Sequence, residues 1–146
     1  MDIETQKALA EQALAALERG NLQTVDIACA KLNGYRASTE NTLWHLVRPD
    51  GKEVLCMMRS EVWMWEHVYH ADCIPHYTTD LNAAASLQNL GAVFDSKCIG
   101  SDEYWIVGYR HTYGERVEFR SRSEATARTG AWLKMVAAVG LPERGE

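Results

Sequence analysis

The chain has 146 residues and a formal net charge of -5, with 47% hydrophobic and 24% charged residues. This composition is typical of a folded globular protein, and the length suits one continuous core, so we expect residues 1–146 to form a single domain. The negative balance and the lack of a long Lys/Arg cluster exclude a dedicated binder of duplex nucleic acid. No apolar run approaches the roughly 20 residues of a membrane-spanning helix, so we expect no membrane partner.

Two features bear on the cellular compartment. The first residues, MDIETQKALAEQ, are polar and acidic, whereas a secretory signal is basic and then apolar. The cysteines are far apart and form no Cys-x-x-Cys pair: Cys29, Cys56, Cys73 and Cys98. Both observations favour reduced thiols, mostly filling the core, in a cytoplasmic protein.

The chain is predicted to begin with two helices. Asp2 can cap a helix over about residues 3–19, which Gly20 ends. A second helix begins near Leu22 and ends at Gly34, with apolar residues at three- and four-residue spacing. The apolar stripe expected on the first helix consists of Ile3, Ala10, Leu14 and Leu17.

From Thr42 onward the pattern becomes strand-like. The segments TLWHLVR and KEVLCMM are joined by Pro49-Asp50-Gly51, whose backbone preferences suit a turn, and together they predict a hairpin. The next segment, SEVWMWEHVYHADCIP, is rich in strand formers but has no clean period. We interpret it as a short strand that runs into a loop.

The run PHYTTDLNAAASLQNLG, residues 75–91, predicts a helix over residues 79–90. Thr78 or Thr79 can accept a hydrogen bond from the first free backbone N–H groups, and Asp80 falls in the first turn, where the helix dipole favours a carboxylate. Gly91 is expected to end the helix.

The remaining chain predicts three strands, AVFDSKCI, EYWIVGY and ERVEFRS, followed by a helix. This helix opens with a capping box from Ser121 to Glu124, or with Ser123 as its cap, and ends at Gly140-Leu141-Pro142. The whole order predicts an α+β fold in which helices cover a mainly antiparallel sheet of about five strands.

Three strings resemble the phage ABA sandwich domain family of small phage and prophage proteins. They are VDIACAKLNGYR, PHYTTDLNAAASL and RSEATARTGAWLKMV, and the likeness covers about residues 22–139. The resemblance implies an α/β/α sandwich, a phage or prophage origin and hence the host cytoplasm. Residues 1–20 would add an N-terminal helix to the family core. The family carries no established catalytic motif to transfer.

His67, His70, Cys73 and His76 occur at every third residue, which by composition suggests zinc. On a helix this spacing winds the side chains along the surface, and on a strand it alternates them between faces, so that only an irregular loop gathers all four. We therefore expect no metal site and no cofactor.

No catalytic frame is recognisable in the sequence. Cys73 lies near His70 and His76, but no third group is evident that would orient a histidine base. Acidic residues lie where loops and helix starts ordinarily place them, at Asp72, Asp80, Asp102 and Glu103. We expect a non-catalytic protein, with an enzyme acting on a nucleotide as the third hypothesis.

Aromatic and basic residues gather in the second half of the chain. Aromatic faces stack on bases, while guanidinium groups and helix N-termini bind phosphate. The candidate ligand-binding residues are Tyr77, Thr78, Thr79, Trp105, Tyr109, Arg110, Arg116 and Arg120. Alternatively, the aromatic side chains belong to the core and the arginines keep exposed strands soluble.

Two functional hypotheses follow. The first is a phage accessory protein that binds and sequesters a small nucleotide-derived immune signal and so counters a bacterial defence. The second is a homo-oligomeric module that docks onto a host or phage protein, with five Trp residues, Met57, Met58 and the N-terminal helix as contact surface. Both predict self-association, because the apolar surface exceeds what a monomer tolerates.

Overall fold

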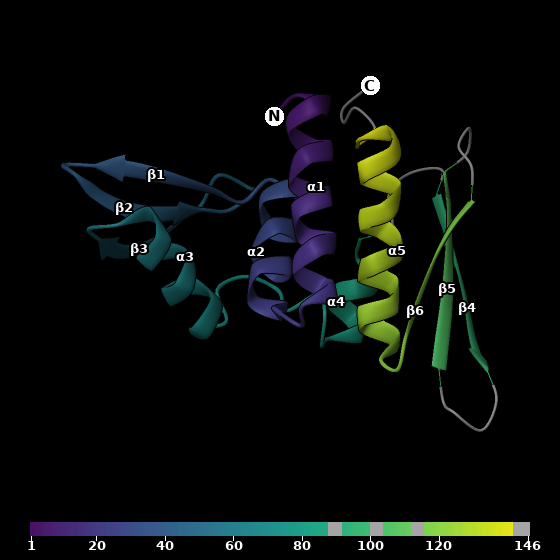
Figure 1. Ribbon diagram of the computed structural model, residues 1–146. Helices are drawn as coiled ribbons and strands as arrows, with labels where there is room; N and C mark the ends of the chain where they lie inside the picture. The colour runs from purple at the N-terminus through teal and green to yellow at the C-terminus, as the bar shows by residue number, and fades with distance from the viewer. Residues whose placement is uncertain (88–91, 100–103, 112–115, 142–146) are drawn as a thin grey trace.

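The computed structural model describes residues 1–87, 92–99, 104–111 and 116–141 (Figure 1). Over these residues helices and strands combine into an α+β fold, which confirms the predicted class. In chain order the elements are α1 (Ile3–Glu18), α2 (Leu22–Leu32), β1 (Arg36–Glu40), β2 (Leu43–Val47), β3 (Glu53–Met58), α3 (Glu61–His70), α4 (Leu81–Ala85), β4 (Ala92–Ile99), β5 (Tyr104–His111), β6 (Arg116–Ser121) and α5 (Glu124–Val139).

The strands form two separate antiparallel sheets, in the orders β1-β2-β3 and β4-β5-β6. Figure 1 shows the first sheet at one end of the molecule and the second at the other, with α1, α2 and α5 between them. The expectation of one sheet between two helix layers is therefore wrong. Helices α3 and α4 connect β3 to β4. Helix α5 packs on the second sheet and on α1, whereas α3 packs on the first sheet.

The hairpin predicted from Thr42 onward is confirmed as β2 and β3. Its turn is closed by the Arg48 N–H, which donates to the Lys52 carbonyl at 2.8 Å, and by the Gly51 N–H, which donates to the Arg48 carbonyl at 2.9 Å. The Asp50 carboxylate accepts from the Lys52 N–H at 2.9 Å. Strand β1 was not predicted; it pairs with β2 and makes the hairpin a three-stranded sheet.

The segment VWMW is helical, which corrects the predicted strand. Ser60 caps α3 by accepting from the Trp63 N–H, and Glu61 lies in the first turn. Three side chains at helical spacing face inward: Met64, Trp65 and Val68. The helix forms because this apolar face packs against β2 and β3, a tertiary contact that outweighs the strand preference of the sequence.

The predicted helix of residues 79–90 is present as the shorter α4. Its cap is Asp80, whose carboxylate accepts from the Asn82 and Ala83 N–H groups at 2.9 and 3.4 Å. The expected cap at Thr78 or Thr79 is wrong, because Thr78 is turned into the core. The rest of that prediction, residues 88–91 with the stop at Gly91, lies outside the described residues.

Helix α1 is part of the central helix layer, where its alanine-rich face packs on α5 and its end packs on α2. Ala10, Ala13 and Ala16 are buried, and small side chains let two helices approach closely. The apolar stripe is confirmed except at Ile3, which is exposed. The buried alanine face of α1 is thus covered within the chain, and its contact with a partner stays a prediction.

Helix α5 contributes more buried residues than any other described element. Ser123 caps it by accepting from the Thr126 N–H at 3.3 Å, which decides between the two predicted starts. Trp132, Leu133 and Val136 are fully buried in a cluster that extends from α1 to the second sheet. None of the helices among the described residues combines the length and apolarity that crossing a bilayer requires.

Helix α5 lies very close to the second sheet at Gly130. A Cβ atom placed there would overlap the ring of Phe119 on β6. We expect Gly130→Val to lower the free energy of unfolding by about 1–3 kcal/mol through overpacking. Ala138→Val, on the exposed side of the same helix, should change it by less than about 0.7 kcal/mol. Equal losses in chemical denaturation would contradict this packing.

Candidate functional site

The candidate ligand-binding residues do not gather into one surface. Tyr77, Thr78 and Tyr109 are buried in the core, and Thr79 is exposed beside the start of α4. Trp105 is half-buried against the same core. The prediction placed these side chains on one ligand-binding surface with the arginines of the second sheet. The register of β5 and β6 explains why they do not share a surface.

Alternation along β5 and β6 separates the aromatic residues from the arginines. Trp105 and Tyr109 lie on the face of the sheet that α5 covers. The arginines lie on the outer face: Arg110 pairs directly with Arg116, and Arg120 pairs with Ile106. All three arginines are exposed, so an aromatic ring and a guanidinium from this set cannot hold one ligand.

Thr78 belongs to a buried polar cluster centred on Asp26 of α2. The Asp26 carboxylate is fully buried and accepts from the Thr78 N–H at 2.8 Å and from the Thr78 hydroxyl at 3.0 Å. The segment before α4 is also fixed to α5, where Thr126 donates to the Thr78 carbonyl and Thr129 to the Tyr77 carbonyl, both at 2.8 Å. This cluster joins α2, the segment before α4, and α5, which is a structural role.

Burial raises the pKa of Asp26 above its usual range, although the two hydrogen bonds from Thr78, the charge of His76 and a hydrogen bond from Tyr69 act in the opposite direction. Burial and the neighbouring Asp26 also raise the pKa of Tyr69, which stacks on His76 with ring centroids 4.3 Å apart. The carboxyl group is therefore held by hydrogen bonds in a place that penalises its charge.

The histidine and cysteine series is split between a helix and a loop. His67 and His70 are exposed on α3, while Cys73 and His76 are half-buried beyond its end. His76 Nε2 lies 2.9 Å from the Tyr69 carbonyl and 3.2 Å from the Asp72 carboxylate. Among the described residues, no three His, Cys, Asp or Glu side chains gather in a way that could hold a metal ion.

The thiols that the structure describes are free, as predicted, at Cys29, Cys56 and Cys73. Cys29 is fully buried, and burial raises the pKa of its thiol further, so it is an inert core residue. The side chain of Cys98 lies outside what the structure describes.

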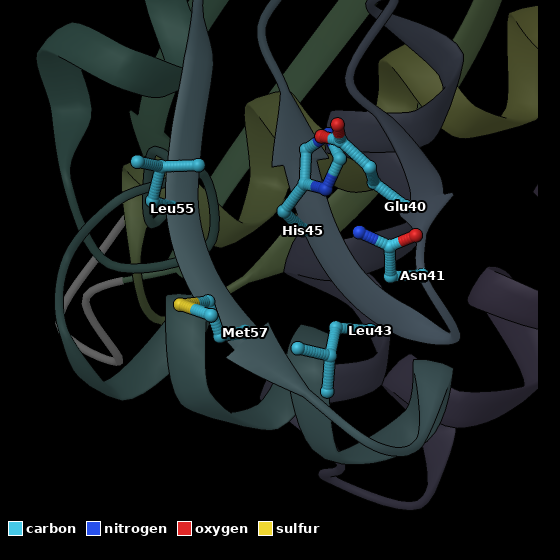
Figure 2. A pocket seen from close by; sticks show the side chains of 6 residues that line it. All are labelled: Glu40, Asn41, Leu43, His45, Leu55 and Met57. Carbon is cyan, nitrogen blue, oxygen red and sulfur yellow. The ribbon is translucent and has the colours of Figure 1, made fainter.

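A pocket of about 240 Å³ lies on the outer face of the first sheet, opposite α3. Its walls come from all three strands and the β1–β2 turn (Figure 2): Glu40, Asn41, Leu43, His45, Leu55 and Met57. The two aliphatic walls on β3 are strongly exposed, with Leu55 74% and Met57 65% accessible to solvent. The pocket is thus a mixed site, apolar on one side and polar on the other.

His45, on the central strand, is the polar centre of this pocket. It is only 5% exposed, and its Nε2 atom has no hydrogen bond among the described residues. Glu53 Oε1 lies 3.4 Å from that nitrogen, close enough for an ion pair but without hydrogen-bond geometry. Buried polar atoms usually have a partner, so this nitrogen marks a position where one is missing.

Backbone strain concentrates around the same pocket. Four described residues other than glycine have positive φ, and three of them border this site: Asn41 at 52°, Thr42 at 66° and Met57 at 47°. Asn41 and Thr42 form the two-residue turn between β1 and β2, where both central residues need positive φ. A β-branched Thr and a Met in this region are costly, and such strain persists most often at functional sites.

Sequence reasoning singled out Met57 but none of the other residues in this pocket. The available signal was KEVLCMM, which is apolar at both alternations and therefore presents apolar side chains on both faces of one strand. Comparison of the chain with protein-family models, curated proteins and solved structures gives no match. The resemblance to the phage ABA sandwich family thus stays a prediction.

We expect Asp26→Ala to lower the free energy of unfolding by about 2–4 kcal/mol, because it leaves the Thr78 N–H and hydroxyl buried without an acceptor. Asp26→Asn keeps one acceptor oxygen and should lose less. Asp72→Ala, which removes an exposed partner of His76, should cost at most about 1 kcal/mol in the same denaturation experiment. An Asp26→Ala protein as stable as Asp72→Ala would refute the role of the cluster.

The stability of the wild type relative to Asp26→Asn should fall as pH rises. The folded-state pKa of Asp26 is above the usual 3.8, so between that pH and the folded value the native state keeps a proton that the unfolded state has released. The difference in unfolding free energy is therefore largest below pH 3.8 and is lost through the folded pKa. Denaturant titrations of both proteins from acid to neutral pH measure it, and a difference that grows with pH contradicts the assignment.

Proposed function

We propose that the protein is a non-catalytic, self-associating docking module that binds a protein partner through the outer face of β1–β2–β3. The observation that carries this proposal is the distribution of exposed apolar side chains. Of eight large hydrophobic residues exposed in the described chain, four fall between residues 55 and 63: Leu55, Met57, Val62 and Trp63. Leu55 and Met57 lie on the outer face of β3, which is the face that the proposal uses. Val62 and Trp63 lie on α3, which covers the opposite face of the same sheet. Both elements are at the end of the molecule away from the second sheet (Figure 1).

Strand β3 is apolar on both faces. Val54, Cys56 and Met58 are half-buried and pack against the core, while Leu55 and Met57 point to solvent. An antiparallel sheet with one wet face normally alternates apolar and polar residues. Exposed Met and aromatic residues are enriched where proteins meet, because they offer large, adaptable contact area.

The strained turn at Asn41–Thr42 and the strained Met57 support the same face. Positive φ is ordinary at both central residues of a two-residue hairpin turn, but it is unfavourable for the β-branched Thr42, and a regular strand would not give Met57 this conformation. A binding site that is formed before the partner arrives loses less entropy on binding.

The second candidate is the sequestration of a small nucleotide-derived immune signal by a phage or prophage protein in the host cytoplasm. The exposed outer face with Arg110, Arg116 and Arg120 favours it, because guanidinium groups bind phosphate. The aromatic residues meant to stack on the base lie on the other face, which places this candidate second. Calorimetry with cyclic nucleotides and ADP-ribose derivatives tests it, and uniform absence of binding removes it.

The docking proposal predicts that Leu55→Ser with Met57→Ser weakens complex formation at least about tenfold, since truncating central apolar contacts costs most of the binding energy of an interface. The thermal midpoint should not fall, because both side chains are exposed. The measurement is the amount of protein retained by the tagged chain from infected cells, identified by mass spectrometry.

The matched control is Ile3→Ser with Val139→Ser, which removes two exposed apolar side chains from the helix layer. This control should retain the same proteins as the wild type. Equal retention by the wild type, the β3 variant and the control would overturn the docking proposal.

A further inference from the structure

The pocket around His45 has the chemistry of a receptor for a guanidinium group. No described residue makes a hydrogen bond with the buried His45 Nε2 atom, and the Glu53 carboxylate lies 3.4 Å from it. Glu40 lines the pocket from β1, while Leu55 and Met57 form an apolar wall on β3 (Figure 2). A planar cation with several N–H donors can donate to a ring nitrogen and a carboxylate together, and its aliphatic stem can lie along the apolar wall.

The outer face of the second sheet carries three arginines and one glutamate among the side chains that the structure describes. Arg110 stands directly opposite Arg116 across β5 and β6, and like charges in that position repel. Arg116 is engaged by Glu118 and lies over Gly108, where no side chain intervenes. Arg110 is exposed beside this pair. An incoming carboxylate would relieve the repulsion between the two arginines.

We propose that the outer face of the first sheet binds the outer face of the second sheet of another copy of this chain, with Arg110 of that copy in the pocket beside His45 and Glu53. The inference rests on the proposed docking function and names its partner. Among the described side chains, the first face carries one arginine and two glutamates, and the second carries three arginines and one glutamate. The two faces are therefore complementary in charge.

The position of the two sheets on opposite sides of the helix layer determines the symmetry of the proposed assembly. The two faces lie at opposite ends of the molecule with the helices between them, so one chain cannot satisfy its own pocket (Figure 1). A contact between two different faces is heterologous, and it joins copies head to tail into a ring or an open chain. The pocket is complete only when a second copy supplies the arginine.

Sedimentation velocity over a range of protein concentrations tests this assembly. The wild type should form species larger than a dimer as the concentration rises. Glu53→Arg removes the acceptor and Arg110→Glu the donor, and each alone should weaken association more than about tenfold. Both positions are exposed, so the folded state should be kept, as circular dichroism can verify. Glu53→Gln and Arg110→Gln repeat the test without charge reversal.

Mixing the two variants gives the sharpest result. Arg110 of the Glu53→Gln chain can enter the intact pocket of the Arg110→Gln chain, whereas each of the two remaining faces lacks its charge, so the mixture should form a dimer that neither variant forms alone. The charge-reversed pair is not mixed, because its two remaining faces carry opposite charges and attract each other. Glu11→Arg and Arg19→Glu make the same charge changes on exposed positions at α1 and should behave as the wild type.

A wild type that stays monomeric overturns the inference, and so does a dimer that the two variants leave unchanged. The proposed docking function survives either result if Leu55→Ser with Met57→Ser still abolishes retention of another protein. If the Leu55→Ser with Met57→Ser chain retains the same proteins as the wild type, the docking function is wrong as well, regardless of the oligomeric state of the purified protein.

Discussion

The two hydrogen bonds from Thr78 to the buried Asp26 carboxylate are the constraint on which the arrangement of the molecule depends. They fix the segment before α4 against α2, and the carbonyls of that same segment accept hydrogen bonds from Thr126 and Thr129 of α5. A chain of polar contacts therefore runs across the helix layer in a region that is otherwise apolar. A buried polar network with unpaired groups would be less stable than an apolar core. When every group has a hydrogen-bond partner, the network specifies one placement of the helices relative to each other. The second sheet packs on α5, while the first sheet packs on α3, which in turn contacts α2. The placement of these helices therefore also sets where the two outer faces lie.

The outer face of the first sheet is not covered by any helix that the structure describes. Helix α3 takes one face of β2 and β3, and its buried side chains Met64, Trp65 and Val68 satisfy that side alone. On the other face, His45 is buried by the side chains of its own sheet, while Leu55 and Met57 remain in water. Exposed apolar area and a buried nitrogen without a partner both cost free energy in the isolated chain. A matching surface on this face would offset that cost, and this is the physical basis of the docking proposal.

Local signals sufficed for much of the fold. The caps at Asp2 and Ser123 and the turn at Asp50 were predictable because the side chain that makes the structure is adjacent in sequence. Helix α3 was missed because its reason is packing against β2 and β3, which no local pattern contains. The split into two sheets was missed for the same reason, since strand pairing is decided by which helices intervene. Trp105 and Arg110 occupy odd and even positions of β5, so the sequence alone predicts that they lie on opposite faces. Which β6 residues share the face of Arg110 depends on the pairing register of β5 and β6, which only the folded hairpin sets. The pocket at His45 depends on registers of this kind in three strands.

The side chain of Gln6 has a consequence for the connectivity of the fold. Its carbonyl oxygen accepts from the Leu141 N–H at 2.9 Å, so the beginning of α1 and the segment after α5 are held side by side (Figure 1). Covalent order is therefore not what keeps α1 and α5 together; their packed faces and this hydrogen bond do. A chain rearranged by joining these two regions and opening an exposed turn elsewhere, such as Pro49 to Gly51, would retain all the layers and both outer faces.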